Sequence, residues 1–261
     1  MYFEVIKMNI KILVATHKEY FMPNDSIYLP IQVGKAISSV SLPWVGDNTG
    51  DNISAKNKNY CELTALYWAW KNLDADVIGL AHYRRHFVLR KPGLFCKNKF
   101  NHILNSTEAE PLLQNTSVIL PKPRNYFIET NYSQFIHAHP AESLEITKKI
   151  LTEKYPDYLP SYEQVMTRTK AHRFNMFLMK QELFHDYCQW LFDILFELEK
   201  NLDISSYSDY NQRIFGFISE RLLDVFIEAN HISYQELPVL FMEQEHWIKK
   251  GTAFLKRKFF H

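Results

Sequence analysis

The chain has 261 residues, of which 46% are hydrophobic and 23% are charged, a composition typical of a folded globular protein. Its formal net charge of +1 argues against a dedicated nucleic-acid-binding protein, because such proteins are usually strongly basic. No apolar run approaches the roughly 20 residues of a membrane-spanning helix and no signal-peptide pattern is present, so we expect a cytoplasmic protein.

Three short apolar runs predict the buried strands of an α/β fold. Residues 11–16 (KILVAT) and 76–81 (DVIGLA) are each followed at once by polar residues, and residues 117–120 (SVIL) end at Pro121. Continuous apolar runs of this length are typical of strands buried on both faces, as in a parallel sheet. Between the first two runs, the apolar residues of segment 57–72 recur with the period of a helix, which predicts one helix there.

The second half of the chain changes character. Residues 175–179 (NMFLM) predict a further strand, and segments 182–200 and 211–229 carry apolar stripes at helical spacing. We find no internal repeat and no low-complexity linker. We therefore expect a single α/β domain over residues 1–261, with a mainly parallel central sheet flanked by helices and a helical C-terminal part. Its core should lie at residues 9–240, followed by a basic and aromatic tail at 241–261.

Polar clusters follow the first two predicted strands directly, where open α/β sheets bind their ligands. They are Thr16, His17 and Lys18 after the first strand, and His82, Tyr83, Arg84 and Arg85 after the second. A guanidinium group matches the geometry of phosphate oxygens, so paired arginines at a strand end suit a diphosphate. The alternative is that one arginine forms an ion pair with a structural carboxylate such as Glu62.

Segment 44–59 (WVGDNTGDNISAKNKN) is rich in side-chain oxygens and amides. Its candidate ligand-binding residues are Asp47, Asn48, Asp51, Asn52, Ser54 and Asn59. Such groups suit ribose hydroxyls, a base edge or a cation, although the spacing differs from that of an EF-hand loop. The alternative is a turn that leads into the N-terminus of the helix predicted over residues 57–72.

His137 and His139 form an HxH pair. On a strand both rings would point to one face and could hold a metal ion, but only Glu142 is an obvious carboxylate nearby and no cysteine is close. We therefore favour a sugar-binding or general-base loop there and expect no metal site. The tail HWIKKGTAFLKRKFFH interleaves basic and aromatic residues, which suits either an anionic membrane surface or a terminal helix packed on the core.

Four longer motifs are similar to those of one known family: WVGDNTGDNISAKNKNYCELTALYWAWKN, IGLAHYRRHF, NMFLMKQELFHDYCQWLFDIL and RIFGFISERLL. Together they resemble a bacterial polysaccharide-synthesis family, long known only as a domain of unknown function and later assigned as glycosyltransferase family 111. The similarity extends over residues 12–227. It implies a GT-A-like fold and the transfer of a sugar, namely galactofuranose from UDP-galactofuranose, to a growing capsule, O-antigen or exopolysaccharide chain or to a lipid-linked acceptor.

The resemblance also implies roles for the clusters. A GT-A-like fold binds its nucleotide at the end of the first strand, and the 46–59 loop with Glu62 would complete the donor site beside the second cluster. Most GT-A enzymes carry a metal-binding DxD motif where this sequence has HYRR. We therefore expect a transferase without a metal cofactor, in which Arg84 and Arg85, with Lys18, stabilise the departing UDP; dependence on manganese or magnesium is the alternative.

An inverting transfer needs a general base for the acceptor hydroxyl. Glu142 is the favoured candidate and Glu220 the alternative, and Asn175 is expected to face the acceptor. The expected partners are a UDP-sugar donor, a saccharide acceptor and the inner face of the cytoplasmic membrane, with no nucleic acid. Two other functions stay open: an inactive sugar-nucleotide-binding or scaffold protein, and a phosphate-recognising hydrolase.

Overall fold

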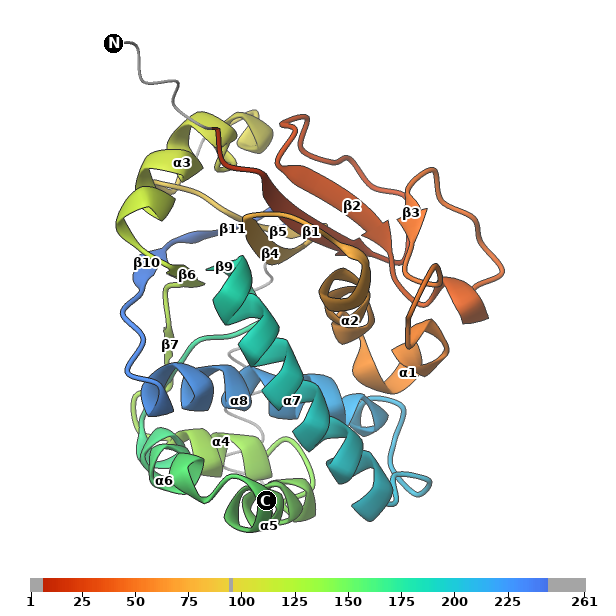
Figure 1. Ribbon diagram of the computed structural model, residues 1–261, viewed down its shortest axis with the longest axis vertical. Coiled ribbons are helices and arrows are strands. Elements are labelled where there is room, and N and C mark those ends of the chain that lie inside the picture. The colour runs from red at the N-terminus through yellow and green to blue at the C-terminus, as the bar shows by residue number, and fades with distance from the viewer. Residues whose placement is uncertain (1–6, 94–95, 244–261) are drawn as a thin grey trace.

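The computed structural model describes residues 7–93 and 96–243, and a mixed nine-stranded sheet forms its centre (Figure 1). The main path of this sheet runs β10 (Gln235–Leu237), β6 (Val118–Pro121), β9 (Phe177–Lys180), β4 (Val77–His82), β1 (Ile10–Thr16), β2 (Tyr28–Gln32) and β3 (Val45–Gly46). β5 (Arg85–Phe87) pairs with both β4 and β11 (Val239–Phe241), and β7 (Arg124–Asn125) forms a separate pair with β8 (Lys170–Ala171).

Eight α-helices and five short 3-10 helices surround the sheet in the described residues. The α-helices are α1 (Asn57–Tyr60), α2 (Leu63–Asn72), α3 (Ser106–Asn115), α4 (Asn131–Ile136), α5 (Glu142–Lys154), α6 (Leu159–Thr167), α7 (Gln181–Asn201) and α8 (Ile214–Ala229). The 3-10 helices are η1 (Lys35–Ile37), η2 (Ser54–Lys56), η3 (Lys99–His102), η4 (Pro156–Tyr158) and η5 (Asn211–Arg213). Within the described residues, no helix is long and apolar enough to cross a membrane.

Strands β1, β2, β3 and β4 run parallel, which confirms the predicted α/β fold with a mostly parallel sheet. Ala15 pairs with His82 and Thr16 pairs with Gln32, so β1, β2 and β4 end at the same edge. The strand predicted over residues 175–179 is β9, which runs antiparallel between β4 and β6. As a result, the N-terminal end of β9 lies beside the carboxyl end of β4.

Two apolar cores cover the two faces of the sheet, because successive side chains of a strand point to opposite faces. Leu13 of β1 and Leu80 of β4 belong to the larger core, which α2, α7 and α8 complete. Ile12 and Val14 belong to the smaller core, together with residues of α3. Figure 1 shows α2 and α7 together on one side of the sheet and α3 near the N-terminal end of β1.

The helix predicted over residues 57–72 is in fact two helices. α1 ends at Tyr60, α2 begins at Leu63, and Cys61 between them adopts φ 52°, which is uncommon for a residue other than glycine. The break turns Cys61 and Glu62 toward the edge of the sheet at which β1 and β4 end. Most of the predicted tail, residues 244–261, lies outside the described residues.

Candidate active site

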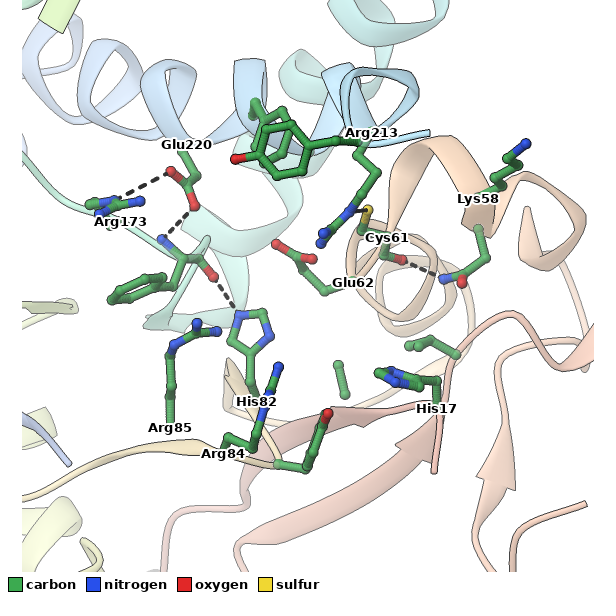
Figure 2. Close-up of a pocket in the computed structure, with 18 residues that line it drawn as sticks. His17, Lys58, Cys61, Glu62, His82, Arg84, Arg85, Arg173, Arg213 and Glu220 are labelled. Atoms are coloured by element: carbon green, nitrogen blue, oxygen red, sulfur yellow. Dashed lines mark hydrogen bonds and ion pairs between the residues drawn. The ribbon is translucent and has the colours of Figure 1, made fainter. Parts of the chain in front are cut away.

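A cavity of about 450 Å³ opens where β1 and β4 end (Figure 2). We call it the basic cavity. Three parts of the chain supply its polar and aromatic lining: the strand ends with His17, His82, Tyr83, Arg84 and Arg85; the α1–α2 junction with Asn57, Lys58, Cys61 and Glu62; and the region around α8 with Arg173, Phe174, Tyr210, Arg213, Phe217 and Glu220.

Positive charge dominates the basic cavity. Of the described side chains that line it, five carry a positive charge and two are carboxylates. Arg84 forms an ion pair with Glu243 at 3.0 Å, but among the described residues neither Arg85 nor Arg213 has a carboxylate oxygen within 4.0 Å. Unpaired arginines in a partly enclosed site favour an anionic ligand, because a phosphate would supply the missing acceptors.

The dipeptide Phe174–Asn175 holds three side chains of the basic cavity. The Phe174 amide donates to Glu220 Oε1 at 3.0 Å, and its carbonyl lies 2.7 Å from His82 Nε2. Asn175 Nδ2 donates to Glu62 Oε1 at 2.8 Å. Both residues have positive φ, 75° and 52°, a backbone conformation that costs free energy outside glycine and tends to occur at functional sites.

The His82 ring is neutral and has one nitrogen free to accept a hydrogen bond. Burial lowers its pKa, Glu62 opposes this and Arg85 adds to it, so the ring is uncharged near neutral pH. A carbonyl can only accept, so Nε2 carries the proton that bonds Phe174. Nδ1 then keeps a free lone pair, and Figure 2 shows the ring turned toward the side chains that surround the cavity.

Cys61 is not a nucleophile. Its pKa is raised to about 11 by burial and by the neighbouring Glu62, against an opposing effect of Arg213. The thiol is therefore protonated near neutral pH, and only the thiolate is reactive. Its sulfur instead accepts a hydrogen bond from Arg213 Nε at 3.1 Å, which fixes that guanidinium beside the cavity.

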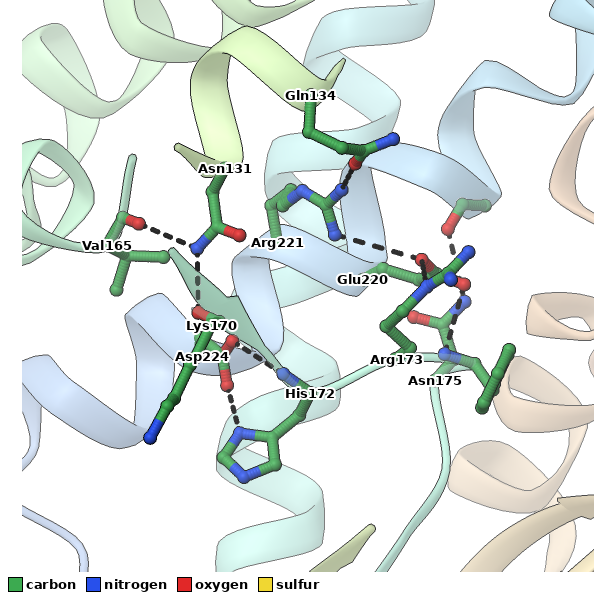
Figure 3. A network of polar contacts seen from close by, with 12 residues as sticks. Asn131, Gln134, Val165, Lys170, His172, Arg173, Asn175, Glu220, Arg221 and Asp224 are labelled. Carbon is green, nitrogen blue, oxygen red and sulfur yellow. Dashed lines mark hydrogen bonds and ion pairs between the residues drawn. The ribbon is translucent and has the colours of Figure 1, made fainter. Parts of the chain in front are cut away.

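A buried polar network lies behind Glu220 (Figure 3). Arg221 Nη2 donates to Gln134 Oε1 at 2.6 Å, and Arg221 Nη1 lies 3.8 Å from Glu220 Oε2. Arg173 Nε lies at the same distance from that oxygen. One turn further along α8, Asp224 accepts hydrogen bonds from the amide and the ring of His172. These contacts connect α8, which carries Glu220, to Gln134, Arg173 and His172.

The structure brings six of the predicted site residues together in the cavity wall: His17, Glu62, His82, Tyr83, Arg84 and Arg85. Lys18, Thr16, His139 and Asn175 lie next to the wall. Lys18 Nζ lies 5.3 Å from the centre of the Tyr83 ring, and Thr16 is buried and donates to the Lys18 carbonyl. His139 stacks on the lining residue Phe217 at 4.1 Å.

The predicted ligand contacts of segment 44–59 need correction. Asp47 and Ser54 are fully buried, and Asp47 accepts from the amides of Gly34 and Lys35 and from the hydroxyls of Ser54 and Thr64. Their oxygens tie this segment to its neighbours and cannot reach a ligand. The remaining predicted residues of the segment lie outside the cavity lining: Asn48, Asp51, Asn52 and Asn59. The segment is the turn into α1 that we considered as the alternative.

The interpretation of the second histidine cluster also changes. His137 and His139 follow α4 instead of lying on a strand, so their rings do not share a strand face. His137 Nδ1 pairs with Glu129 at 2.7 Å, and His139 Nδ1 with Asn211 at 3.1 Å. Glu142 is an exposed residue in the first turn of α5 and does not line the basic cavity. In the described part of the chain, no group of three or more His, Cys, Asp or Glu side chains is arranged to hold a metal ion.

Sequence reasoning missed three cations of the cavity. Arg173 lies outside the quoted motifs. Lys58 lies in segment 44–59 and Arg213 begins the motif RIFGFISERLL, but neither was singled out as a ligand-binding residue. One available signal concerns Arg173, which lies two residues before the predicted strand 175–179. Had the antiparallel direction of that strand been known, Arg173 would have been placed at the carboxyl end of β4.

The architecture and the cavity define an α/β protein with a predominantly basic cavity at the ends of its parallel strands. The chain belongs to the family described as a domain of unknown function, DUF4422, whose model matches residues 11–231. It is also similar to the apo structure of WbbM, a bifunctional glycosyltransferase, with a TM-score of 0.82 and 31% sequence identity. The match covers 91% of this chain and 46% of the WbbM chain, so this chain spans under half of that protein. No curated protein matches the sequence.

Proposed function

We propose that this protein is a glycosyltransferase that binds the diphosphate of a nucleotide-sugar donor in the basic cavity. The observation that carries the proposal is the excess of five permanent cations over two carboxylates at the carboxyl ends of β1 and β4. Phosphate oxygens accept hydrogen bonds from guanidinium groups in the fork geometry that arginine offers. The fold shared with a bifunctional glycosyltransferase supports the same class of reaction.

In this reaction the bond between the anomeric carbon and a phosphate oxygen breaks, and the diphosphate leaves with the electron pair. Arg84 and Arg85 line the cavity side by side and stabilise the negative charge that develops on the leaving group. Following the family resemblance, we propose UDP as the nucleotide, galactofuranose as the sugar and no metal cofactor. His17 and Tyr83, whose rings meet edge to face at 5.5 Å, form the wall beside these arginines.

The acceptor hydroxyl must lose its proton as it attacks the anomeric carbon. We propose Glu220 as the base in place of Glu142, because Glu220 lines the cavity and Glu142 does not. The Phe174 amide holds one Glu220 oxygen at 3.0 Å. The other oxygen lies 3.8 Å from a guanidinium nitrogen of both Arg173 and Arg221. This distance is too long for a hydrogen bond, so the oxygen stays available to the acceptor hydroxyl. Glu62, fixed by Asn175, would bind hydroxyls of the donor sugar.

The acceptor is proposed to be a growing surface polysaccharide or a lipid-linked saccharide. Such a substrate would bring the protein to the inner face of the cytoplasmic membrane. The predicted basic and aromatic tail would contribute to that contact, but it lies mostly outside the described residues.

A thermal-shift experiment tests the donor site. UDP, GDP, CMP and dTDP are each added to the full chain, with manganese or with EDTA. A ligand that binds only the native state stabilises it by about 2.7 kcal/mol at one hundred times its dissociation constant, so UDP should raise Tm. Because we propose no metal cofactor, the rise should be equal with manganese and with EDTA. The R85Q variant should lose this shift, and R90Q, which removes an exposed arginine outside the basic cavity, should keep it.

Other outcomes reject parts of the proposal. A UDP shift that requires manganese overturns the role of the arginines as the replacement for a cation. UDP binding without transfer of sugar favours the inactive sugar-nucleotide-binding protein. No response to any nucleotide rejects the donor site.

A further inference from the structure

A second cavity, of about 390 Å³, lies between the β1–β2 connection and the η3–α3 region. We call it the amide-rich cavity. Its aromatic lining residues are Phe21, Tyr28 and Phe100, and its amide residues are Asn24, Asn98, Asn101 and Asn105. Among the described residues, no lysine, arginine or histidine lines it, so its chemistry is opposite to that of the basic cavity.

An exposed aromatic platform forms one wall. Phe21 leaves 60% of its surface accessible, an unusual degree for a phenylalanine. Its ring meets that of Phe100 edge to face, with centroids 4.4 Å apart, so the two rings hold each other in place. The platform offers an apolar face to whatever enters the cavity.

The polar groups of the cavity are uncharged or already engaged. Asn98 Oδ1 accepts from the Phe100 amide and Asn105 Oδ1 from the Glu108 amide, which orients their free amide nitrogens. Asn24 and Asn101 are exposed, and neither side chain forms a hydrogen bond with another described residue. The Asp25 carboxylate is taken up by the amides of Ile27 and Ser106 and by the Ser106 hydroxyl.

We propose that the amide-rich cavity binds a neutral sugar unit of the acceptor glycan. A side-chain amide both donates and accepts, which matches hydroxyl groups that do the same. The ring faces match the apolar C–H face of a pyranose, while a phosphate or carboxylate would meet no cation. This inference rests on the proposed function, because it takes the acceptor to be a saccharide.

The amide-rich cavity lies close to the basic cavity along the chain. The segment after β1 runs from His17, in the wall of the basic cavity, to Phe21, in the wall of the amide-rich cavity. Four Cα–Cα steps span at most about 14 Å. Tyr20 lies between, its ring 5.0 Å from that of Tyr83. An acceptor that occupies both cavities would therefore pass Tyr20, with its growing end at Glu220.

Saturation-transfer NMR on the full chain tests the site directly. The probes are the methyl glycosides of galactose, glucose, rhamnose and N-acetylglucosamine, with inorganic phosphate as competitor. We expect saturation transfer to at least one glycoside, about tenfold weaker binding in F21A, a loss of roughly 1.4 kcal/mol, and a similar effect in N101A. F127A removes a phenylalanine that is 78% exposed and outside both cavities, and it should bind as the unmodified chain does.

The same samples separate this inference from the proposed function. The thermal shift with UDP reports the basic cavity and should be identical in F21A and F127A, which also shows that both variants are folded. Sugar binding without any UDP response leaves the saccharide site standing and rejects the donor site. Three results would overturn the saccharide site: no saturation transfer to any glycoside, saturation transfer that persists unchanged in F21A, or displacement of the glycoside by phosphate.

Discussion

Asn175 Nδ2 donates a hydrogen bond to Glu62 Oε1 at 2.8 Å, across 113 positions of the sequence. The same nitrogen lies 3.1 Å from the Gly216 carbonyl, so one amide group links the start of α2, the turn into β9 and the first turn of α8. Asparagine is one of the few residues that tolerate the left-handed conformation observed here, φ 52°. Asn175 therefore serves the backbone and the cavity at once.

Comparing N175G with N175A separates these two contributions. Glycine keeps the left-handed backbone and removes both hydrogen bonds, so we expect a loss of about 1–3 kcal/mol in the free energy of unfolding and a lower rate of sugar transfer. Alanine should lose a further 1 kcal/mol or so, because it also bears the strain of positive φ. Urea denaturation measures both, and equal stability of the two variants would contradict the strain.

The assignment of the base is tested by E220Q. The amide keeps the shape of the side chain but cannot take a proton, so turnover should fall by about 10²–10⁴-fold while UDP still shifts Tm as before. E142Q is the discriminating comparison, since Glu142 lies outside the basic cavity. If E142Q loses turnover and E220Q retains it, the base predicted from the sequence is the right one.

Asp47 should matter for stability more than for ligand affinity. Four donors converge on its buried carboxylate, and D47A leaves at least the amides of Gly34 and Lys35 and the Ser54 hydroxyl without that acceptor, so it should cost about 3 kcal/mol. D51A, which alters an exposed neighbour in the same segment, should change stability by no more than about 0.5 kcal/mol. A stable D47A protein with weakened UDP binding would restore the ligand role.

The His172–Asp224 pair should make stability depend on pH. Burial alone would lower the pKa of His172, but the hydrogen bond and charge of Asp224, with Glu236, raise it above its usual 6.5. Folding therefore favours the protonated ring. The contribution of the pair to the free energy of unfolding is fully present below about pH 6.5, the pKa in the unfolded chain, and is lost as the pH rises through the higher pKa of the folded protein. The free energy of unfolding should fall over this range, and D224N should flatten the fall. Equal slopes in the two proteins would reject the pair as the cause.

The sequence predicted β1, β4, β6 and β9, because continuous apolar runs such as 11–16 and 76–81 are local signals, but it did not predict the other strands. It could not reveal that β9 inserts antiparallel between β4 and β6, since strand direction follows from tertiary packing. The break at Cys61 was also hidden. Neither glycine nor proline marks it, and its positive φ is maintained by contacts with distant residues such as Arg213.

The residues of the candidate site also fall into those that a local sequence signal revealed and those that it did not. His82, Tyr83, Arg84 and Arg85 were found because they are contiguous with a predicted strand. Arg173 and Arg213 enter the cavity from segments more than 80 residues further along the chain, and neither directly follows a predicted strand as Arg84 and Arg85 do. Asp47 was misassigned because a buried cluster of hydrogen bonds and a ligand-binding loop use the same residue types.

Two consecutive residues, Phe174 and Asn175, fix His82, Glu62 and Glu220, which come from three different elements. Substitutions at these three positions are therefore energetically coupled through a shared support, although the side chains lie on separate elements. A change that shifts this dipeptide alters the acid–base groups together. The cavity should consequently respond to combined substitutions as one unit, and the effect of a double variant will differ from the sum of its singles.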